Sequence, residues 1–384
     1  MTANTFRLTF LSVLISLTLG AHNGQLGLLI KPISEFFGVS ITAAAAQFSW
    51  LNGGILFGNV VAIGFFRFFK MRWIVAVCNL ALAVAAVFIF MTTSFRALAP
   101  LFFSTGIALG VGVCAASTIL THIWSEQQRQ SALVAQDAFF NGGGMIFPYL
   151  LGLLLVQQFS WGWGFLSMGI VAVVIVGLSM FSRFDFETKS QNDKGAGIEW
   201  APGLVVAGIS MFLIIISQIS VIIWLPTFLE ERFEVSSIVS AGVIAQIYIA
   251  ALIGSIVSTV VVAKVSIQRF LIVIVSIGCV SIFLFTLVPT IGWATVNAYV
   301  FGLAIAALYH SFIAWGLSYI RKPGYAEVTF LYICAGVSGT LTPYVSSKVV
   351  EDFSISTTFL GCSAAYGAIL ILMLALNSYS RRRA

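Results

Sequence analysis

The chain has 384 residues, of which 60% are hydrophobic and only 8% are charged. Soluble domains carry about a quarter charged residues, so this composition excludes a water-soluble fold. The apolar stretches are continuous and about 20 residues long rather than alternating, which argues against an outer-membrane barrel. We therefore predict an all-α membrane protein, and we read the net charge of +6 as a record of topology rather than of nucleic-acid binding.

Charged or turn-rich breaks divide the chain into twelve apolar segments, each long enough to cross about 30 Å of hydrocarbon. In the first half the predicted spans are 8–30, 41–66, 73–93, 97–121, 131–156 and 161–182. In the second half they are 200–226, 237–262, 270–289, 293–320, 325–349 and 355–378. The first segment continues well past the length of a signal core and offers no clear cleavage site. We therefore interpret it as a span rather than a secretory signal.

The basic residues alternate between the two sides that twelve spans define. With this count, four Lys and Arg residues fall on one side and the other fifteen fall on the side of both termini. By the positive-inside rule this places both termini in the cytoplasm of a bacterial inner membrane. The fifteen are Arg7, Arg67, Lys70, Arg72, Arg129, Arg183, Lys189, Lys194, Lys264, Arg269, Arg321, Lys322, Arg381, Arg382 and Arg383.

The longest polar stretch lies near the midpoint and separates six spans from six. Sequence similarities recur across it with offsets of 194 to 196 positions: Pro32 with Pro226, residues 39–40 with 235–236, and residues 144–149 with 339–344. A six-helix bundle at 1–182, a cytoplasmic linker at 183–199 and a second bundle at 200–384 are therefore predicted. Two bundles that arise from a parallel repeat are typical of major facilitator transporters.

Three stretches resemble one family of that superfamily, the fucose–proton symporters and specifically the TsgA-type transporters. They are residues 29–40 after the first span, the basic loop at 64–72, and residues 136–148 of the fifth span, which are the most specific. The resemblance covers the whole chain. It implies two pseudo-symmetric lobes and transport by alternating access. It also implies a cavity lined by the first, fourth, seventh and tenth helices.

The chain departs from this pattern at two places. Loops after the second span in the superfamily usually hold an acid beside the basic gate residues, but residues 58–72 contain none. The sugar symporters of the family carry a proton-accepting carboxylate in the first span, where this chain has His22, Asn23 and Gln25. Sugar–proton symport therefore does not follow from the resemblance alone. Arg67 and Arg129 remain candidates for a gate.

Ionisable groups inside spans are costly, so each one is a functional candidate. Asp137 lies about six residues inside the predicted fifth span, where burial would favour the protonated carboxyl near neutral pH. It is a candidate for proton coupling or, alternatively, for a gate pair with a nearby basic residue. His22 and His310 are further candidates for proton coupling or for binding an anionic substrate, because histidine changes charge near physiological pH. Their alternative is a hydrogen-bonded packing role.

Polar and aromatic residues near the middle of the spans are candidates for binding the solute. Amide groups hydrogen-bond hydroxyls, and aromatic rings stack on other rings or on the apolar faces of sugars. As a set they suit a neutral polar or aromatic solute better than a strong anion. The candidates are Asn23, Gln25, Gln47, Trp50, Asn141, Gln218, Gln246, Tyr248, Asn297, Tyr309 and Tyr332.

The sequence contains no phosphate-binding loop, catalytic triad or metal-ligand cluster. We therefore expect no enzyme activity, no cofactor and no metal. The predicted protein is a monomeric secondary transporter that uses an ion gradient, with a proton as the first choice, or the gradient of its solute. Two alternatives stay open: proton-driven efflux of a small molecule such as a siderophore or drug, and a transporter-like sensor or scaffold that moves no solute.

Overall fold

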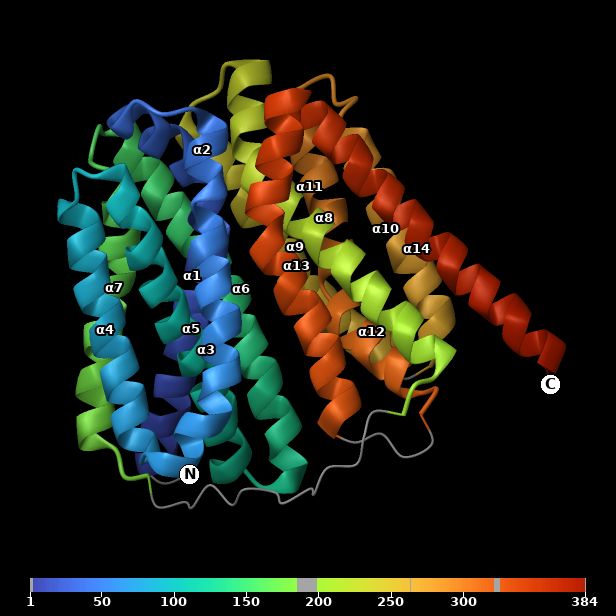
Figure 1. Cartoon of the computed structure of the whole chain (residues 1–384), viewed down its shortest axis with the longest axis horizontal. Helices are drawn as coiled ribbons and strands as arrows, with labels where there is room; N and C mark the ends of the chain where they lie inside the picture. The colour runs from blue at the N-terminus through green and yellow to red at the C-terminus, as the bar shows by residue number, and fades with distance from the viewer. Residues whose placement is uncertain (1–2, 185–198, 263, 321–324, 384) are drawn as a thin grey trace. The chain divides into compact units, whose positions relative to one another are not determined.

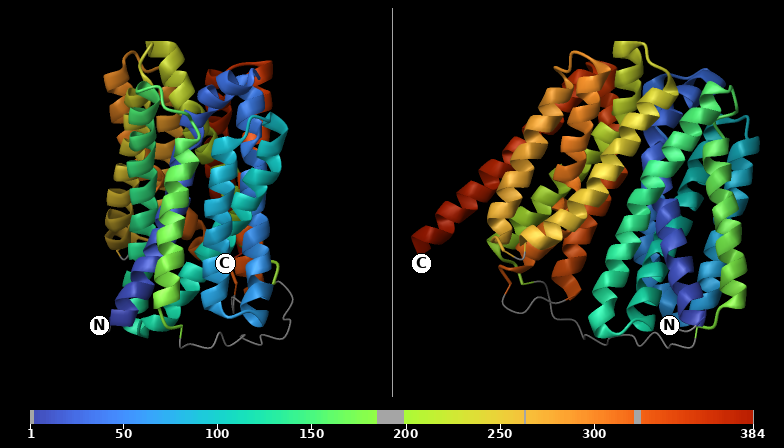
Figure 2. Two further views of the ribbon diagram at one scale, coloured as in Figure 1. Left: turned by 90° about the vertical axis from the view of Figure 1, so that its left-hand side faces the viewer. Right: turned by 180° about the vertical axis from the view of Figure 1, so that it is seen from behind.

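A computed structural model describes residues 3–184, 199–262, 264–320 and 325–383. Within these residues all regular structure is helical, as long rods that run side by side within each half (Figures 1 and 2). The first half holds α1 (Ala3–Phe37), α2 (Ile41–Ala46), α3 (Phe48–Phe68), α4 (Met71–Met91), α5 (Phe95–Ile123), α6 (Glu126–Val156) and α7 (Trp163–Phe181). The second holds α8 (Pro202–Phe233), α9 (Ser237–Val262), α10 (Ile267–Phe285), α11 (Ile291–Ile305), α12 (Leu308–Leu317), α13 (Tyr325–Asp352) and α14 (Ile355–Arg383).

Twelve stretches of the described residues are long and apolar enough to cross a membrane, which confirms the predicted number of spans. Two spans consist of a pair of helices. The second span comprises α2 and α3 with Gln47 between them, and the tenth comprises α11 and α12. The predicted span at 293–320 is thus present, and its helix is interrupted at residues 306–307.

The predicted ends of the first and seventh spans were too early. The predicted spans end at residues 30 and 226, but α1 and α8 continue through Pro32 and Pro226 to Phe37 and Phe233. Proline removes one backbone N–H, yet membrane helices tolerate it where neighbouring groups compensate for the lost hydrogen bond. Both prolines thus lie inside helices at equivalent places of the two halves.

The chain divides into two compact units. One consists of Met1–Gln191 with Val235–Ala245, and the other of Asn192–Glu234 with Gln246–Ala384.

In the first unit, α3 packs directly on α5 through glycines. A Cβ on Gly58 would lie 2.5 Å from the carbonyl oxygen of Ile107, and one on Gly106 would overlap the carbonyl oxygen of Leu51. Membrane helices gain no hydrophobic free energy from leaving lipid for one another, so such close van der Waals approach is what holds them together. The glycines are therefore required by packing.

The second unit repeats this contact between α9 and α11. Gly254 follows Gly58 by 196 positions, and a Cβ on it would lie 3.0 Å from the carbonyl oxygen of Leu303. Gly302 follows Gly106 by 196 positions, and its Cβ would overlap the carbonyl oxygen of Ile247. Leu303 and Ile247 themselves follow Ile107 and Leu51 by the same offset. The same two-glycine contact thus occurs in both halves, at the offset that the sequence repeat predicts.

A second helix pair is also repeated, with one chemical difference. In α6, a Cβ on Gly143 would overlap the carbonyl oxygen of Leu17 in α1. At the equivalent position of α13, 195 residues later, Ser338 donates a hydrogen bond of 2.6 Å to the carbonyl oxygen of Phe212 in α8. In the first half the backbones of α1 and α6 are in direct contact, whereas in the second half the hydroxyl of Ser338 joins α13 to α8.

Basic residues of the first unit stabilise the end of α7. Arg72 at the start of α4 donates to the carbonyl oxygen of Met180, and Arg7 of α1 donates to that of Phe181 at 3.1 Å. The last carbonyls of a helix lack intrahelical partners and carry partial negative charge, which these guanidinium groups compensate. Arg72, from the basic loop after the second span, therefore has a structural partner within its own unit.

Candidate functional site

His22 lies in the interior of the first unit rather than on an exposed face. Its side chain is fully buried, and its ring lies 5.9 Å from that of Phe165 in α7. Phe165 stacks on Phe102 of α5 at 5.2 Å, and Phe102 stacks on Phe48 of α3 at 5.5 Å. His22 thus ends a buried row of rings contributed by four helices.

The polar atoms around His22 are incompletely satisfied. Neither ring nitrogen of His22 nor Oε1 of Gln25 has a hydrogen-bond partner among the described residues. The Gln25 amide nitrogen donates to the carbonyl oxygen of Ala21 at 3.1 Å. A Cβ on Gly164 of α7 would lie 2.6 Å from Oε1 of Gln25, so this amide also faces α7. Asn23, the residue after His22, is only half-buried.

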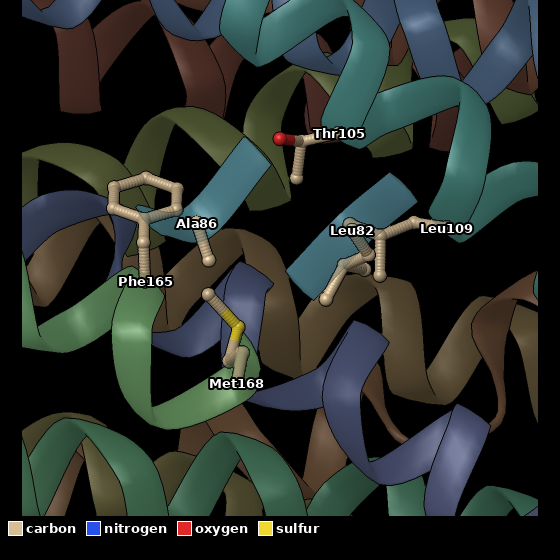
Figure 3. Close-up of a pocket in the computed structure, with 6 residues that line it drawn as sticks. All are labelled: Leu82, Ala86, Thr105, Leu109, Phe165 and Met168. Carbon is tan, nitrogen blue, oxygen red and sulfur yellow. The ribbon is translucent and has the colours of Figure 1, made fainter. Parts of the chain in front are cut away.

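A small apolar pocket lies beside this row of rings. Figure 3 shows its lining, which comes from α4, α5 and α7 of the first unit. Its one polar side chain, Thr105, donates its hydroxyl to the carbonyl oxygen of Leu101 at 2.8 Å and offers little to a polar solute. No predicted site residue lines it, so we do not assign it to solute binding. The lining residues are Leu82, Ala86, Thr105, Leu109, Phe165 and Met168.

Asp137 is exposed, which corrects the prediction that it is buried. Helix α6 begins at Glu126, earlier than predicted, so Asp137 lies eleven residues, about 16 Å, along it. Further along α6, Gly144 and Pro148 pack on Gly24 of α1, so α1 covers this part of α6, whereas Asp137 stays exposed. Asn141 is half-buried, and its amide donates to the backbone carbonyl oxygen of Asp137 at 3.1 Å.

The second unit brings three predicted candidates together. The ring of Tyr309 lies 5.4 Å from that of His310 and 5.8 Å from that of Tyr332. Tyr309 and His310 lie in the first turn of α12, whereas Tyr332 belongs to α13. His310 and Tyr332 are exposed, and Tyr309 is half-buried. These three residues form the most complete group of candidate side chains in the described part of this unit, and we call them the aromatic cluster.

Two other candidates of the second unit hold helices together. Asn297 of α11 donates to the carbonyl oxygen of Ser281 in α10 at 2.8 Å and accepts from the Ser281 hydroxyl at 2.9 Å. Gln218 of α8 donates to the hydroxyl of the buried Tyr366 in α14 at 3.2 Å. Both amides therefore have structural partners that account for part of their polarity.

The candidates in the second and eighth spans lie in different surroundings. Gln47 and Gln246 are half-buried, and the Oε1 atom of each has no hydrogen-bond partner among the described residues. Trp50 is exposed, whereas Tyr248 is buried. The gate candidates Arg67 and Arg129 have side chains that lie outside the described part of the structure.

Polar residues are exposed at equivalent positions of α6 and α13. Asp137 corresponds to Tyr332, and Tyr149 corresponds to Tyr344, each at an offset of 195. Tyr149 is 46% exposed, Tyr344 is 54% exposed and Tyr332 is 47% exposed. We call the exposed residues Asp137 and Tyr149 of α6 and Tyr332 and Tyr344 of α13 the polar faces of the two units.

One buried carboxylate was not among the residues predicted from the sequence. Glu327, in the first turn of α13, is only 4% exposed and accepts a hydrogen bond of 2.7 Å from the backbone N–H of Glu199. Negative charge in the first turn of a helix is favourable, and this contact ties the segment before α8 to α13. Its position near the start of the predicted span at 325–349 is the sequence feature that could have identified it.

The fold and the distribution of polar groups define a multi-pass helical membrane protein built from two related units. Comparison with known proteins identifies its family. The model of the Major Facilitator Superfamily matches residues 8–341, so the chain belongs to this superfamily of transporters and is not an enzyme. The resemblance noted in the sequence is thereby confirmed.

The chain is similar to individual members along its whole length. It is 23% identical to a Protein TsgA homolog of Yersinia pseudotuberculosis and to one of Yersinia pestis, in each case over 99% of this chain and 98% of the relative. Its fold is similar to that of a mutant form of the nucleoside transporter NupG, with a TM-score of 0.78 and 15% identity, covering 96% of this chain and 99% of NupG. The xylose transporter XylE from E. coli, in a partially occluded inward-open conformation, gives a TM-score of 0.75 at 13% identity, with coverage of 97% and 98%.

Proposed function

We propose that this chain is a proton-coupled secondary transporter that moves a small polar or aromatic solute by alternating access. It acts as a monomer in a bacterial inner membrane with both termini in the cytoplasm. Membership of the superfamily supplies the class of activity. The solute, the coupling ion and the orientation are the proposed part.

The exposed polar faces of α6 and α13 are the observation that carries this proposal. A carboxylate and tyrosines that faced lipid within a span would be costly, so in membrane proteins such groups line water-filled cavities or the interior of a bundle. Their presence at equivalent positions of both repeats supports the proposal that this face of each unit is in contact with water. Asp137 is the proposed proton carrier, because it is the carboxylate of these faces and its side chain is exposed.

The solute class follows from the chemistry of the candidate residues. Amides and tyrosines predominate among them, and the similar structures NupG and XylE are named for nucleosides and xylose, which are neutral compounds with hydroxyl groups. The excess of basic residues on one side supports the proposed orientation.

Counterflow in proteoliposomes tests transport directly. Vesicles containing the purified protein are loaded with an unlabelled solute from a panel of sugars, nucleosides and amino acids, and a trace of the labelled solute is added outside. We expect rapid transient uptake of at least one solute, dependent on the loaded solute and absent from protein-free vesicles. A sensor or scaffold would bind a member of the panel without any counterflow, and that result would contradict transport.

A further inference from the structure

The tenth span is built differently from its repeat equivalent, the fourth. Helix α5 runs without interruption from Phe95 to Ile123, whereas the tenth span is broken at Ala306 and Ala307. No proline or glycine stands at these positions. Instead, Ser255 of the neighbouring α9 donates to the carbonyl oxygen of Ala306 at 3.3 Å, in addition to that of Ala251 at 2.9 Å. A neighbouring hydroxyl thus compensates a carbonyl at the break.

The break changes the surroundings of the residue that follows it. In the first unit, the thiol of Cys114 in α5 contacts Oδ1 of Asn59 in α3 at 3.4 Å. In the second half, the positions equivalent to Asn59 and Cys114 lie 196 residues later and are occupied by Ser255 and His310. Ser255 bonds to the broken backbone instead, and His310 is exposed. Cys114 therefore contacts a neighbouring helix, whereas His310, at the equivalent position next to the interruption, is exposed.

His310 belongs to the aromatic cluster. The ring planes of Tyr309 and His310 lie at 72°, and those of Tyr309 and Tyr332 at 44°. The rings thus present differently oriented surfaces with phenolic hydroxyls and imidazole nitrogens at their rims. Irregular backbone at membrane depth is tolerated only where protein buries it or where it lines a water-filled cavity. Exposed His310 and Tyr332 beside the break fit the second case.

We propose that Tyr309, His310 and Tyr332 form a subsite that binds a planar heteroaromatic ring of the solute. The inference rests on the proposed function and narrows its solute class to compounds that carry such a ring, for example a nucleobase. Stacking on these side chains supplies most of the binding, and the hydroxyl and imidazole groups bond to polar atoms at the edge of the ring. A saturated sugar without a ring of this kind gains little from the cluster.

Binding and counterflow of three probes test this subsite in the purified full-length protein. The probes are uridine, adenosine and xylose, and affinity is measured from the rise in melting temperature with probe concentration. The variants are Tyr332→Ala and Tyr332→Phe. Tyr299→Ala serves as the matched control, because Tyr299 is an exposed tyrosine of α11 outside the cluster. A melting temperature without probe close to that of the wild type shows that each variant is folded.

Uridine or adenosine should stabilise the wild-type protein and xylose should not. The affinity for the nucleoside should fall about tenfold in Tyr332→Ala, as expected for the loss of one stacked ring, and change little in Tyr332→Phe and Tyr299→Ala. Binding of neither nucleoside, or equal affinity of the Tyr332→Ala variant and the wild type, would overturn the subsite. Xylose counterflow without nucleoside binding would overturn it and leave transport standing. Nucleoside binding through Tyr332 without counterflow would support the subsite and contradict transport.

Discussion

Gly143→Val should strongly destabilise the first unit, whereas the same change at the neighbouring Gly142 should not. A Cβ on Gly143 would overlap the carbonyl oxygen of Leu17, and a rigid backbone atom cannot move aside as a side chain can. A Cβ on Gly142 would meet nothing within 4 Å. Forcing α1 and α6 apart should cost about 2–3 kcal/mol or more, which corresponds to a fall in melting temperature of roughly 5–10 °C. Thermal unfolding of the purified variants in detergent, followed by tryptophan fluorescence, measures this difference.

The adjacent pair controls for helix propensity, because both variants replace glycine by valine in the middle of one helix. Equal melting temperatures of the two variants would show that the close contact of α1 with α6 does not determine the stability of this unit. Substitution of Ser338, the equivalent residue of the other unit, should have a smaller effect on stability. Ser338→Ala removes only the hydrogen bond to Phe212 and should cost about 1 kcal/mol.

Asp137→Asn should abolish accumulation of solute against its gradient and preserve counterflow. The amide is similar in shape to the carboxyl group and keeps its polarity, but it cannot take up a proton. Counterflow exchanges solute for solute and needs no net movement of protons, so it should survive. With an imposed proton gradient, the ratio of internal to external solute should fall from well above 1 in the wild type to about 1 in the variant.

Glu351→Gln is the matched control for this prediction. Glu351 is also an exposed carboxylate, but it pairs with Lys348 at 2.7 Å near the end of α13 and is assigned no role in transport. Its replacement should leave accumulation unchanged. Unaltered accumulation in Asp137→Asn would exclude Asp137 as the proton carrier. Loss of both accumulation and counterflow would favour the alternative, in which Asp137 belongs to a gate.

The number of spans was predictable because it depends on composition over about 20 residues. The repeat was predictable because residues 144–149 and 339–344 retain related sequences at the places where helices pack. Gly58 and Gly254 also occupy equivalent positions of the two repeats. Their role in helix packing could be recognised only in the structure, because the sequence does not show which backbone a glycine approaches.

The features that escaped prediction depend on neighbours distant in sequence. The break at Ala306 has no local signal, and the hydroxyl that compensates it comes from Ser255 on another helix. Burial of His22 and exposure of Asp137 depend on which helices cover each face of α1 and α6. Both residues are ionisable groups within apolar segments, so their sequence contexts look alike although their surroundings are opposite.

Water accessibility of the polar faces tests most directly the claim that these residues are in contact with water and with the solute. In a background with the five native cysteines replaced, Asp137→Cys, Tyr332→Cys and Val173→Cys are each treated with a membrane-impermeant maleimide in opened membrane vesicles. Val173 is an exposed apolar residue of α7 and serves as the lipid-facing control. We predict rapid labelling of the cysteines at 137 and 332, slowed by the solute that gives counterflow, and little labelling at 173. If the cysteines at 137 and 332 were as unreactive as that at 173, the two faces would lie in lipid and the proposed solute path would be wrong.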